Sequence, residues 1–567
     1  MKNRPIFLAL VIVFFCTLNA CVTKKDSGPT VGSLDEIYEG VAFDMPRIAE
    51  PVFNDFSTDI TQFGGVGDGI TKNTDAFSKA IQAVSAQGGG KVVVPRGIWY
   101  TGPFMLKSNV NLVVVEGALI TFSRDFNDYP LVETSFEGLD TYRCQSPISG
   151  KDLENIAITG KGIIDGSGEI WRPVKKEKLT ERQWKVLVQS GGVVSDDGKI
   201  WYPSEKSKLG DQRNNFNVPD FQKREEFETV KDFLRPVMVS LINCKNVLLD
   251  GPTFQNSPAW NIHPLMCESV IIRNLTVKNP WFGQNGDGLD LESCKNVLVY
   301  RNNFDVGDDA ICIKSGKDEV GRQRAMATEN VIIKNNIVYH GHGGFTVGSE
   351  MSGGVRNIHI SNCTFIGTDI GLRFKSTRGR GGVVENIYIS YIDMINIPAE
   401  AISFNLYYEG KSPIPEGADQ ADEGKIPEQT AYPVSEETPV FRNIYMDRIT
   451  VSNSETGALF QGLPEMQLQN VTLENSVIEA KYGISMADSE GITFKNVLIK
   501  TSVEPSLSIY NCQKLRFEGL NLVNTHSENL VNVKGTKTGS VKFIDSNIQP
   551  STIMVSLEVE ANAVTVD

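Results

Sequence analysis

The sequence predicts an all-β protein, a single-stranded right-handed parallel β-helix whose N-terminal end is capped by one helix. A short phrase recurs through most of the chain: a polar residue, often asparagine, is followed by valine or isoleucine and then by alternating apolar residues. Successive copies are mostly 20 to 30 residues apart, and no second helix is expected among them. Such repeats indicate coils that stack with about 4.8 Å between strands and bury their inward-facing side chains.

The apolar residue of each phrase marks one coil. These residues are Ile156, Val247, Val270, Val297, Val331, Ile358, Ile387, Ile444, Val471, Ile492, Leu515 and Val541. From Val247 the steps are 23, 27, 34, 27 and 29 residues, then 57, then 27, 21, 23 and 26. The step of 57 corresponds either to two coils or to one coil carrying the loop 411–438, which is rich in Pro, Glu and Gly. At the coil corners we expect structural ladders of stacked residues, at Asn243-Cys244, Ser293-Cys294, Asn362-Cys363 and Asn511-Cys512.

One amphipathic helix precedes the repeats, over residues 73–87, with Asn73 or Thr74 as its N-cap and three glycines after it. Its apolar residues recur at helical spacing, at Phe77, Ala80, Ile81 and Val84. Strands are expected at 91–94 and 110–115. The helix would cover the open N-terminal end of the solenoid, where strand edges and core would otherwise meet water.

The N-terminus has the layout of a secretory signal, with Lys2 and Arg4 before an apolar run that is short for a membrane span. Leu18-Asn19-Ala20-Cys21 resembles the lipobox of bacterial lipoproteins, in which the cysteine is acylated. We therefore expect a signal peptide at 1–20, lipidation of Cys21, a tether without a fold at 21–50 and the parallel β-helix domain at 51–567. An ordinary signal peptide with a chance cysteine is the alternative, and it would place the protein in the same compartment. The expected location is the bacterial cell envelope, at the outer membrane or periplasmic face.

The formal net charge of −14 argues against nucleic acid as a partner. It also argues against a polyanionic substrate unless the cleft is locally basic. Seven cysteines follow Cys21, and they form no CxxC or Cys/His cluster. The odd number at long spacings is a poor disulfide framework, so we expect buried thiols and no metal site.

One segment interrupts the repeats, between Trp171 and Arg235. It is charged and aromatic, and residues 172–189 are expected to be helical. Long insertions in a solenoid project from one face, often the binding face. A solvated excursion without a role is the other interpretation of this segment.

Three carboxylates gather in residues 285–309. Asp287 lies in an Asn-Gly-Asp-Gly turn, and an apolar strand then leads to the pair Asp308-Asp309. Hydrolysis of a glycosidic bond requires one carboxylic acid for the leaving oxygen and a base on the far side of the sugar. Counted from the apolar residue of each coil, these aspartates, His342, Arg373 and Lys375 fall at similar phases of four consecutive coils. They are therefore expected to share one groove.

These residues resemble a known family, glycoside hydrolase family 28, the polygalacturonases and their relatives. The matching motifs are Asn285-Gly286-Asp287, Gly307-Asp308-Asp309, Gly341-His342-Gly343 and Arg373-Phe374-Lys375. Residues 63–69 and 88–95 resemble the N-terminal stretch with which the domain begins in the wider superfamily of pectin-active β-helix proteins. The whole resemblance spans about residues 55–550. The family commonly has Ser or Thr at the position of Gly286 and Ile at that of Phe374, but neither departure removes a group that the chemistry needs.

The resemblance implies hydrolysis with inversion, with Asp308 as general acid and with Asp287 and Asp309 holding and deprotonating the water. A carboxyl group crowded by two like charges has a raised pKa, so the three form one coupled system. His342 would tune the acid or steer its proton. Arg373 and Lys375 would bind a substrate carboxylate.

The implied substrate is an acidic polysaccharide, pectin or its oligomers, and no cofactor is expected. Basic residues near the motifs would supply the locally positive cleft, namely Lys314, Arg322, Arg324, Arg373, Lys375, Arg378 and Arg380. Further candidates for substrate binding, each equally compatible with a place in the core, are Trp260, His263, Tyr339 and Tyr408. The protein is expected to be a monomer that meets a membrane only through its lipid.

The expected reaction is cleavage of α-1,4-galacturonosyl linkages, with exo action favoured because the insertion would close one end of the groove. The main alternative is a hydrolase of rhamnogalacturonan on the same fold, although relatives that cleave beside rhamnose tend to lack the Arg-x-Lys pair. A pectate lyase would need a calcium site and an arginine base. A non-catalytic glycan-binding β-helix would have no reason to keep carboxylates, His and Arg-x-Lys in one register.

Overall fold

The structure is a computed structural model that describes residues 35–408, 430–525 and 528–567. The predicted signal peptide and Cys21 lie outside the described residues, as does most of the loop 411–438. Residues 35–40 belong to a separate unit and contain the one-turn helix α1 (Asp35–Tyr38), while residues 41–567 form a second unit. Within the described ranges, no helix is both long enough and apolar enough to span a membrane.

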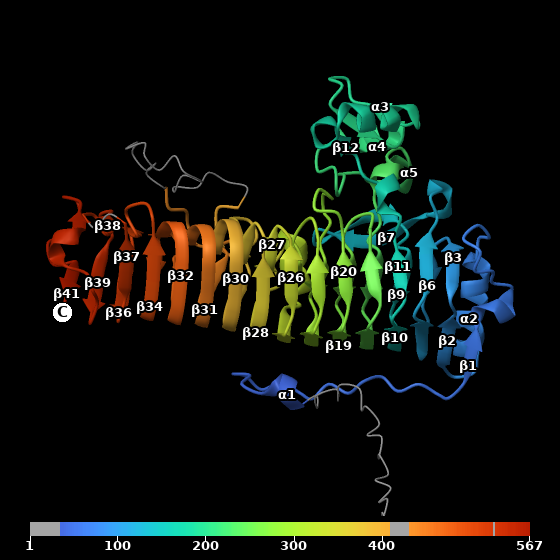
Figure 1. Cartoon of the computed structure of the whole chain (residues 1–567), viewed down its shortest axis with the longest axis horizontal. Helices are drawn as coiled ribbons and strands as arrows, with labels where there is room; N and C mark the ends of the chain where they lie inside the picture. Colours follow the sequence, from blue (N-terminus) through green and yellow to red (C-terminus); the bar gives the residue numbers. More distant parts are fainter. Residues whose placement is uncertain (1–34, 409–429, 526–527) are drawn as a thin grey trace, which may run out of the picture. The chain divides into compact units, whose positions relative to one another are not determined.

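The second unit is a right-handed parallel β-helix, in which strands from successive coils lie beside one another in a 36-stranded sheet (Figure 1). One row of strands contains the repeated phrase, and the first of its strands to carry the phrase are β10 (Glu154–Gly160), β16 (Lys245–Asp250), β19 (Glu268–Arg273), β22 (Lys295–Tyr300) and β25 (Thr328–Lys334). It continues through β28 (Val355–Ile366), β30 (Val383–Asn405), β31 (Val440–Gln461) and β32 (Leu468–Ala487). The apolar residues that mark the coils pair directly from Ile156 to Val471, so the predicted fold and phase are confirmed.

Asparagine turns the chain at the coil corners. Asn155, Asn246 and Asn296 have φ of 54°, 53° and 57°, a left-handed conformation that asparagine tolerates better than most residues. Their amides form ladders between coils, as in the 3.1 Å bond from Asn246 Nδ2 to Asn155 Oδ1. The residues before the corner cysteines share this conformation, with φ of 51–52° at Asn243, Ser293, Asn362 and Asn511. The seven cysteines of the described ranges are free and buried, as predicted.

The long step and the step of 34 residues are explained by loops. Ile387 pairs with Ile444, so the step of 57 is one coil with a loop, and the two-coil alternative is wrong. The step of 34 contains a short helix, α6 (Asp318–Arg324), between β24 (Ile311–Lys314) and β25, so the expectation of no helix among the repeats is also wrong. This helix has one large apolar residue, Val320, which is 37% exposed, so no apolar stripe could reveal it.

The N-terminal cap is the helix α2 (Thr74–Ala86), as predicted. Its apolar face is buried beside β2 (Gly90–Val94) and β5 (Val110–Val114), and the Phe77 ring stacks on Phe104 at 4.7 Å. Asn73 is the N-cap residue, but its side-chain oxygen accepts from the Val66 N–H rather than from the helix. The cap therefore also holds the loop before it.

Residues 41–50 differ from the predicted tether without a fold. The Phe43 ring lies 6.2 Å from that of Tyr388, Ile48 is 6% exposed and Glu50 forms an ion pair with Arg273. This short segment has no period, yet it packs along the coils because the solenoid offers it aromatic and charged partners. The expectation is wrong for these ten residues.

The segment between Trp171 and Arg235 stands out from the coils (Figure 1). It contains a small sheet, β12 (Val174–Lys175), β14 (Ile200–Tyr202) and β13 (Val193–Val194), and the helices α3 (Glu181–Gln189), α4 (Glu205–Asp211) and α5 (Arg224–Glu228). The predicted helix at 172–189 begins only at Glu181, because Thr180 and Gln183 form a capping box there. A hairpin that the sequence did not predict, β7 (Leu131–Phe136) with β8 (Leu139–Cys144), lies beside it.

Candidate active site

A second row of parallel strands carries the candidate residues. It includes β9 (Ile148–Lys151), β15 (Val239–Ile242), β18 (Ile262–Leu265), β21 (Leu289–Glu292), β24, β27 (Gly343–Val347) and β29 (Ile370–Lys375). Asp287 precedes β21, the Asp308-Asp309 pair precedes β24 and His342 precedes β27, while Arg373 and Lys375 lie within β29. The four coils are neighbours in the order predicted, and their turns bring these residues to one face of the coils, which we call the groove.

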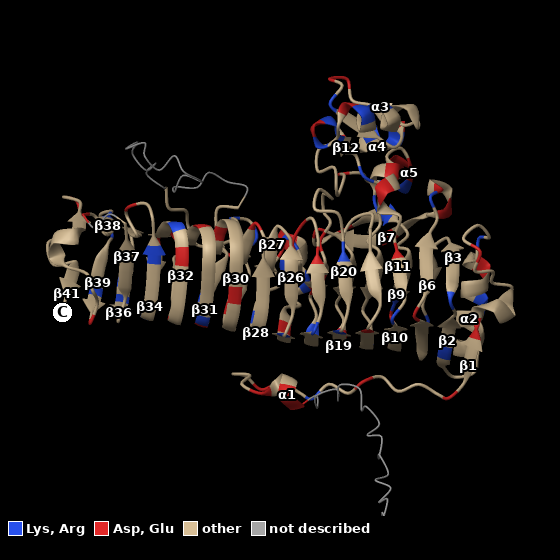
Figure 2. Ribbon diagram, in the orientation of Figure 1, with Lys and Arg blue, Asp and Glu red and all other residues tan. Residues whose placement is uncertain are grey.

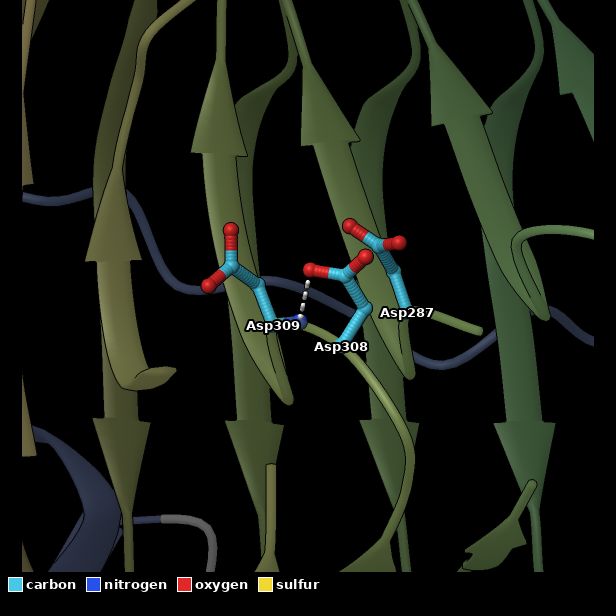
Figure 3. A group of neighbouring side chains, drawn as sticks. All are labelled: Asp287, Asp308 and Asp309. Carbon is cyan, nitrogen blue, oxygen red and sulfur yellow. Dashed lines mark hydrogen bonds between the residues drawn. The ribbon is translucent and has the colours of Figure 1, made fainter. Parts of the chain in front are cut away.

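The three aspartates form a compact group (Figure 3). One carboxylate oxygen of each lies within 4.8 Å of the others. Asp287 and Asp309 are buried, whereas Asp308 is partly exposed and its Oδ1 accepts the Asp309 N–H at 3.0 Å. The most accessible carboxyl group of the three is thus the one predicted to be the acid.

Asp309 is held by two cations. Lys375 Nζ donates to its Oδ2 at 2.9 Å, and Arg373 Nη1 and Thr346 Oγ1 donate to its Oδ1 at 3.1 and 3.0 Å. Burial alone would raise the pKa of Asp309, but Lys375 and Arg373 outweigh it and hold the pKa well below its usual range. Asp309 is therefore ionised.

Asp287 and Asp308 have the opposite tendency. Burial, followed by the charges of Asp290 and Asp308, raises the pKa of Asp287 well above its usual range. Burial and the adjacent Asp309 charge also raise the pKa of Asp308. Two carboxyl groups with raised pKa values thus lie beside one whose pKa is lowered, which is the division that acid–base catalysis requires. Oδ1 of Asp287 is buried and has no hydrogen-bond partner among the described residues.

A buried charged layer lies behind these residues. Lys314, which is 4% exposed, donates to Glu350 at 2.9 Å and lies 3.6 Å from Asp290. Burial raises the pKa of Asp290 well above its usual range, although Lys314 opposes the rise. Lys314 was expected to touch substrate, but these partners enclose it. Sequence reasoning missed Asp290 and Glu350; the alternation of β21, which turns Asp290 and Glu292 to the same face, was the available signal for Asp290.

His263 is also enclosed rather than exposed to the groove. It is 1% exposed, its Nε2 lies 2.9 Å from Glu292 Oε2, and its ring meets Trp260 edge-on at 5.1 Å. Trp260 is 2% exposed and stacks on Phe136 at 4.3 Å. The core alternative therefore describes both residues, because the hairpin covers them.

His342 lies at the edge of the aspartate group. Its backbone N–H donates to the Asp308 carbonyl at 2.9 Å, and its Nδ1 lies 2.8 Å from Asp369 Oδ2. Asp369 was not predicted, and it orients the imidazole. Among the predicted aromatic residues, Tyr339 is 42% exposed, whereas Tyr408 lies under Lys375, whose Nζ is 4.9 Å from the ring centre.

Lys and Arg are interspersed with Asp and Glu along the coils (Figure 2). The predicted local excess of positive charge is not found, since each of the seven basic residues is paired with an acid. The pairs are Lys314 with Asp290 and Glu350, Arg322 with Glu437, Arg324 with Glu292, Arg373 and Lys375 with Asp309, Arg378 with Glu465, and Arg380 with Asp318. An anionic substrate must share these cations with the acids that already hold them.

Two segments contact the coils that carry the aspartates, residues 131–144 and 171–235, and we call them the cover. Lys317 N–H, which follows β24, donates to the Gly138 carbonyl at the hairpin tip at 3.3 Å. Arg235 Nη2 donates to Asn285 Oδ1 at 2.8 Å, two residues before Asp287. Asn217 Nδ2 donates to Glu137 at 2.6 Å and thereby links the two parts of the cover.

The three aspartates are also the kind of group that can hold a metal ion, with one oxygen from each. Arg373 and Lys375 already occupy both oxygens of Asp309, and the raised pKa values of the other two reduce their charge. The donor set therefore fits a divalent ion poorly.

Comparison with known proteins gives one consistent picture. Residues 184–421 match the family model for glycosyl hydrolases family 28. An exo-poly-alpha-D-galacturonosidase of Dickeya chrysanthemi is 30% identical over 357 residues, which are 62% of this chain and 57% of that protein. An endo-polygalacturonase of Pectobacterium carotovorum is 28% identical over 363 residues, 61% of this chain and 76% of that one. The crystal structure of an exopolygalacturonase from Thermotoga maritima aligns with a TM-score of 0.61 and 30% identity, over 84% of this chain and 94% of that one.

Proposed function

This chain belongs to glycosyl hydrolase family 28, and on that basis we propose that it hydrolyses α-1,4-galacturonosyl linkages of pectin or oligogalacturonides. The observation that carries the proposal is the contrast between Asp308 and Asp309. Adjacent in the chain, they have pKa values displaced in opposite directions, up for Asp308 and down for Asp309. A proton donor and an ionised carboxylate thus lie side by side in a groove that also holds two cations.

Asp308 is the general acid in this proposal. Its raised pKa keeps the proton that the leaving glycosidic oxygen requires, and its partial exposure lets the carboxyl group reach that oxygen. The His342 imidazole, anchored by Asp369, lies beside it and orients the proton or the sugar hydroxyls.

Asp309 and Asp287 form the base side. Asp309 is ionised and accepts the proton of the attacking water, while the unbonded Oδ1 of Asp287 positions that water. A carboxylate with so low a pKa is a weak base. Binding of substrate corrects this, because a uronate that takes donors from Arg373 and Lys375 allows the pKa of Asp309 to rise.

Arg373 and Lys375 have donors to share. Arg373 uses only Nη1 for Asp309, and its guanidinium has five N–H donors in all. Lys375 has three donors and lies above the Tyr408 ring. One uronate beside the scissile bond is thus recognised by the same cations that keep the base ionised, which links substrate charge to catalysis.

We propose that the reaction inverts the anomeric configuration. Inverting enzymes usually hold their carboxyl groups about 6.5 to 9.5 Å apart, and retaining enzymes about 5 to 5.5 Å. Here the oxygens lie within 4.8 Å, but a third carboxylate allows water to be held by Asp287 and Asp309 beside the acid. Proton NMR of the first product decides the question: a β-anomer is expected, and an α-anomer would contradict inversion.

Exo action is proposed because the cover closes the groove on one side of the aspartates. The hairpin begins before β9 and reaches Lys317 after β24, so it crosses the intervening coils. A long chain then enters only by its end. Endo action is the alternative, and the relatives include both types.

The deciding experiment is incubation of the purified protein with polygalacturonate, rhamnogalacturonan and oligogalacturonides, followed by sizing of the products. We expect monomer or dimer from polygalacturonate and nothing from rhamnogalacturonan. A ladder of oligomers would mean endo action, and cleavage of rhamnogalacturonan alone would favour the second hydrolase. Ultraviolet absorbance of unsaturated uronides that disappears with a chelator would instead identify a lyase.

Attachment through lipid on Cys21 remains a separate proposal that rests on the sequence alone. Metabolic labelling with a radioactive fatty acid is expected to mark the protein in a bacterial host. Cys21→Ala should remove the label, and an unlabelled wild-type protein would contradict the anchor.

A further inference from the structure

A pocket of about 510 Å³ lies where the cover meets the loop before the catalytic turn. One wall comes from the insertion, through Lys175, Lys178 and Phe216, and the other from Phe282 and Gln284. The volume falls within the usual range for small-molecule sites, about 300 to 1,000 Å³. It is large enough for a sugar unit, and the aspartates and cations described above do not line it.

The charges of this pocket differ from those of the groove. Every groove cation considered above is paired with an acid, whereas among the described residues neither Lys175 nor Lys178 forms an ion pair. Lys176, between them, does pair with Glu181 at 3.3 Å. One acid, Asp211, also lines the pocket, and it accepts a hydrogen bond from the Tyr202 hydroxyl at 2.5 Å. The two lysines are not paired with it or with any other acid among the described residues, so they are available to an anionic ligand.

Two exposed aromatic rings accompany the lysines: Phe282 lines the pocket, and Trp281 precedes it in the chain. Trp281 and Phe282 are 64% and 54% exposed, unusual values for large aromatic residues, and Lys178 Nζ lies 5.0 Å from the Trp281 ring centre. An exposed ring with a cation beside it offers a flat apolar face and a charge together. A uronic acid presents a flat C–H face and a carboxylate, and matches both.

The pocket is tied to the catalytic turn. Arg235 donates to the Gln284 carbonyl at 2.8 Å and to the side chain of Asn285 at 2.8 Å, and Asp287 follows two residues later. The wall of the pocket and the base side of the active site thus belong to one short loop, held by one buried arginine.

We propose that this pocket is a uronate-binding subsite contributed by the insertion. Lys175 and Lys178 bind the carboxylate of a galacturonosyl unit, and Trp281 and Phe282 pack against sugar rings. The inference rests on the proposed function for the identity of the sugar, and it makes the insertion part of substrate recognition.

Binding can be measured without turnover in the Asp308→Asn variant, by calorimetry with tetragalacturonate. Adding Lys175→Gln and Lys178→Gln is expected to raise Kd about tenfold, and Trp281→Ala about fivefold. The matched control is Lys176→Gln, a lysine of the same segment that is already paired, and it should leave Kd within twofold. An α-1,4-linked galactose tetramer, which lacks the carboxylates, should bind weakly and respond to none of the lysine variants.

A double lysine variant with Kd within twofold of its parent would overturn the subsite, as would an Asp308→Asn parent that is folded by circular dichroism but does not bind tetragalacturonate. A different result would contradict the proposed function without contradicting the subsite. Wild-type protein that leaves every pectic substrate intact, yet binds tetragalacturonate through the two lysines, would refute the hydrolase and keep the subsite.

Discussion

The coil stack and the cover place their side chains by different means. In the stack, the backbone ladder fixes each residue: Cys312 pairs with Thr346, and Thr346 with Arg373, across three coils. In the cover, single side chains hold long segments. Arg143 donates to the Asn217 and Arg235 carbonyls, and Arg235 reaches the catalytic turn. In the coil stack, many backbone hydrogen bonds together hold each side chain in place. In the cover, a few side-chain hydrogen bonds hold whole segments in place.

This difference separates two kinds of function. A ladder shared among many coils keeps one oxygen of each of three carboxyl groups within 4.8 Å of the others, a placement that a rigid frame maintains. A cover held by few contacts tolerates change and adapts the groove to its substrate. Substitutions in the stack should therefore change the chemistry, and those in the cover should change which substrates bind and where they are cut.

The largest effect is expected from Asp308→Asn in the stack. Loss of the general acid should lower kcat about 10³-fold with little change in KM, since the amide keeps the shape of the carboxyl group. Steady-state release of reducing ends measures it. Asp305→Asn, an exposed carboxylate three residues earlier that pairs with His340, is the control and should keep full activity. Equal activity in both variants would refute the assignment of the acid.

Phe136→Ala tests the cover. The ring stacks on Trp260 and holds the hairpin over the groove, and its loss should cost about 3 kcal/mol of packing. A released hairpin should open the closed side, so that products from polygalacturonate change from monomer or dimer to a ladder of oligomers. Phe221→Ala, which removes a ring packed on Phe227 elsewhere in the cover, should leave the product pattern as it is. An unchanged pattern in Phe136→Ala would show that the hairpin does not limit access.

Most of the stack was predictable from the sequence because each coil repeats one local rule. The Asn-Val or Asn-Ile phrase marks a corner with a left-handed asparagine, so counting from it gave the register and hence the grouping of Asp287, Asp308, Asp309, His342, Arg373 and Lys375. The charge partners were not predictable, since Glu350 and Asp369 become close to Lys314 and His342 only when coils stack.

The cover was predicted only as an interruption. Its hairpin reaches from the coil of β9 to Lys317. Residues 131–144 contain no repeated pattern from which this contact could be predicted. Contacts between segments far apart in the sequence also explain why the predictions for His263 and for a local excess of positive charge were wrong. From the sequence alone, the side chains of His263 and the seven basic residues were expected to be available to substrate. Phe136 and Trp260 enclose the first, and acids from distant coils neutralise the others.

Lys375→Gln should have a smaller effect than the first two substitutions, and it tests how the stack sets its pKa values. Lys375 helps hold the pKa of Asp309 below its usual range and also lowers that of Asp308. Without it both pKa values rise. The acid limb of the pH–rate profile, where Asp309 gains a proton, and the alkaline limb, where Asp308 loses one, should therefore both move to higher pH. We expect kcat/KM to fall about 30-fold at the optimum.

The control for this profile is Lys295→Gln, a lysine of the neighbouring strand row that pairs with Glu329 at 3.1 Å. It should leave both limbs in place. If Lys375→Gln lowers the maximum rate but leaves both limbs of the pH–rate profile at the same pH, the lysine only binds substrate. It then does not set the protonation of the aspartates.

The smallest expected effect is a gain in stability from Asp290→Asn. Burial raises the pKa of Asp290 in the folded chain, so ionisation at neutral pH opposes folding, and the stability associated with the neutral form is lost as pH rises through the folded-state pKa. An amide is neutral at every pH. The variant should therefore melt on the order of 1 °C higher at pH 7, and the gain should vanish below about pH 4, where the unfolded carboxyl group is also protonated.

Asp196→Asn, a carboxylate of the cover whose side chain is 89% exposed, should leave the melting temperature unchanged at both pH values. A lower melting temperature for Asp290→Asn at pH 7 would mean that Asp290 is ionised and that its attraction to Lys314, 3.6 Å away, outweighs burial.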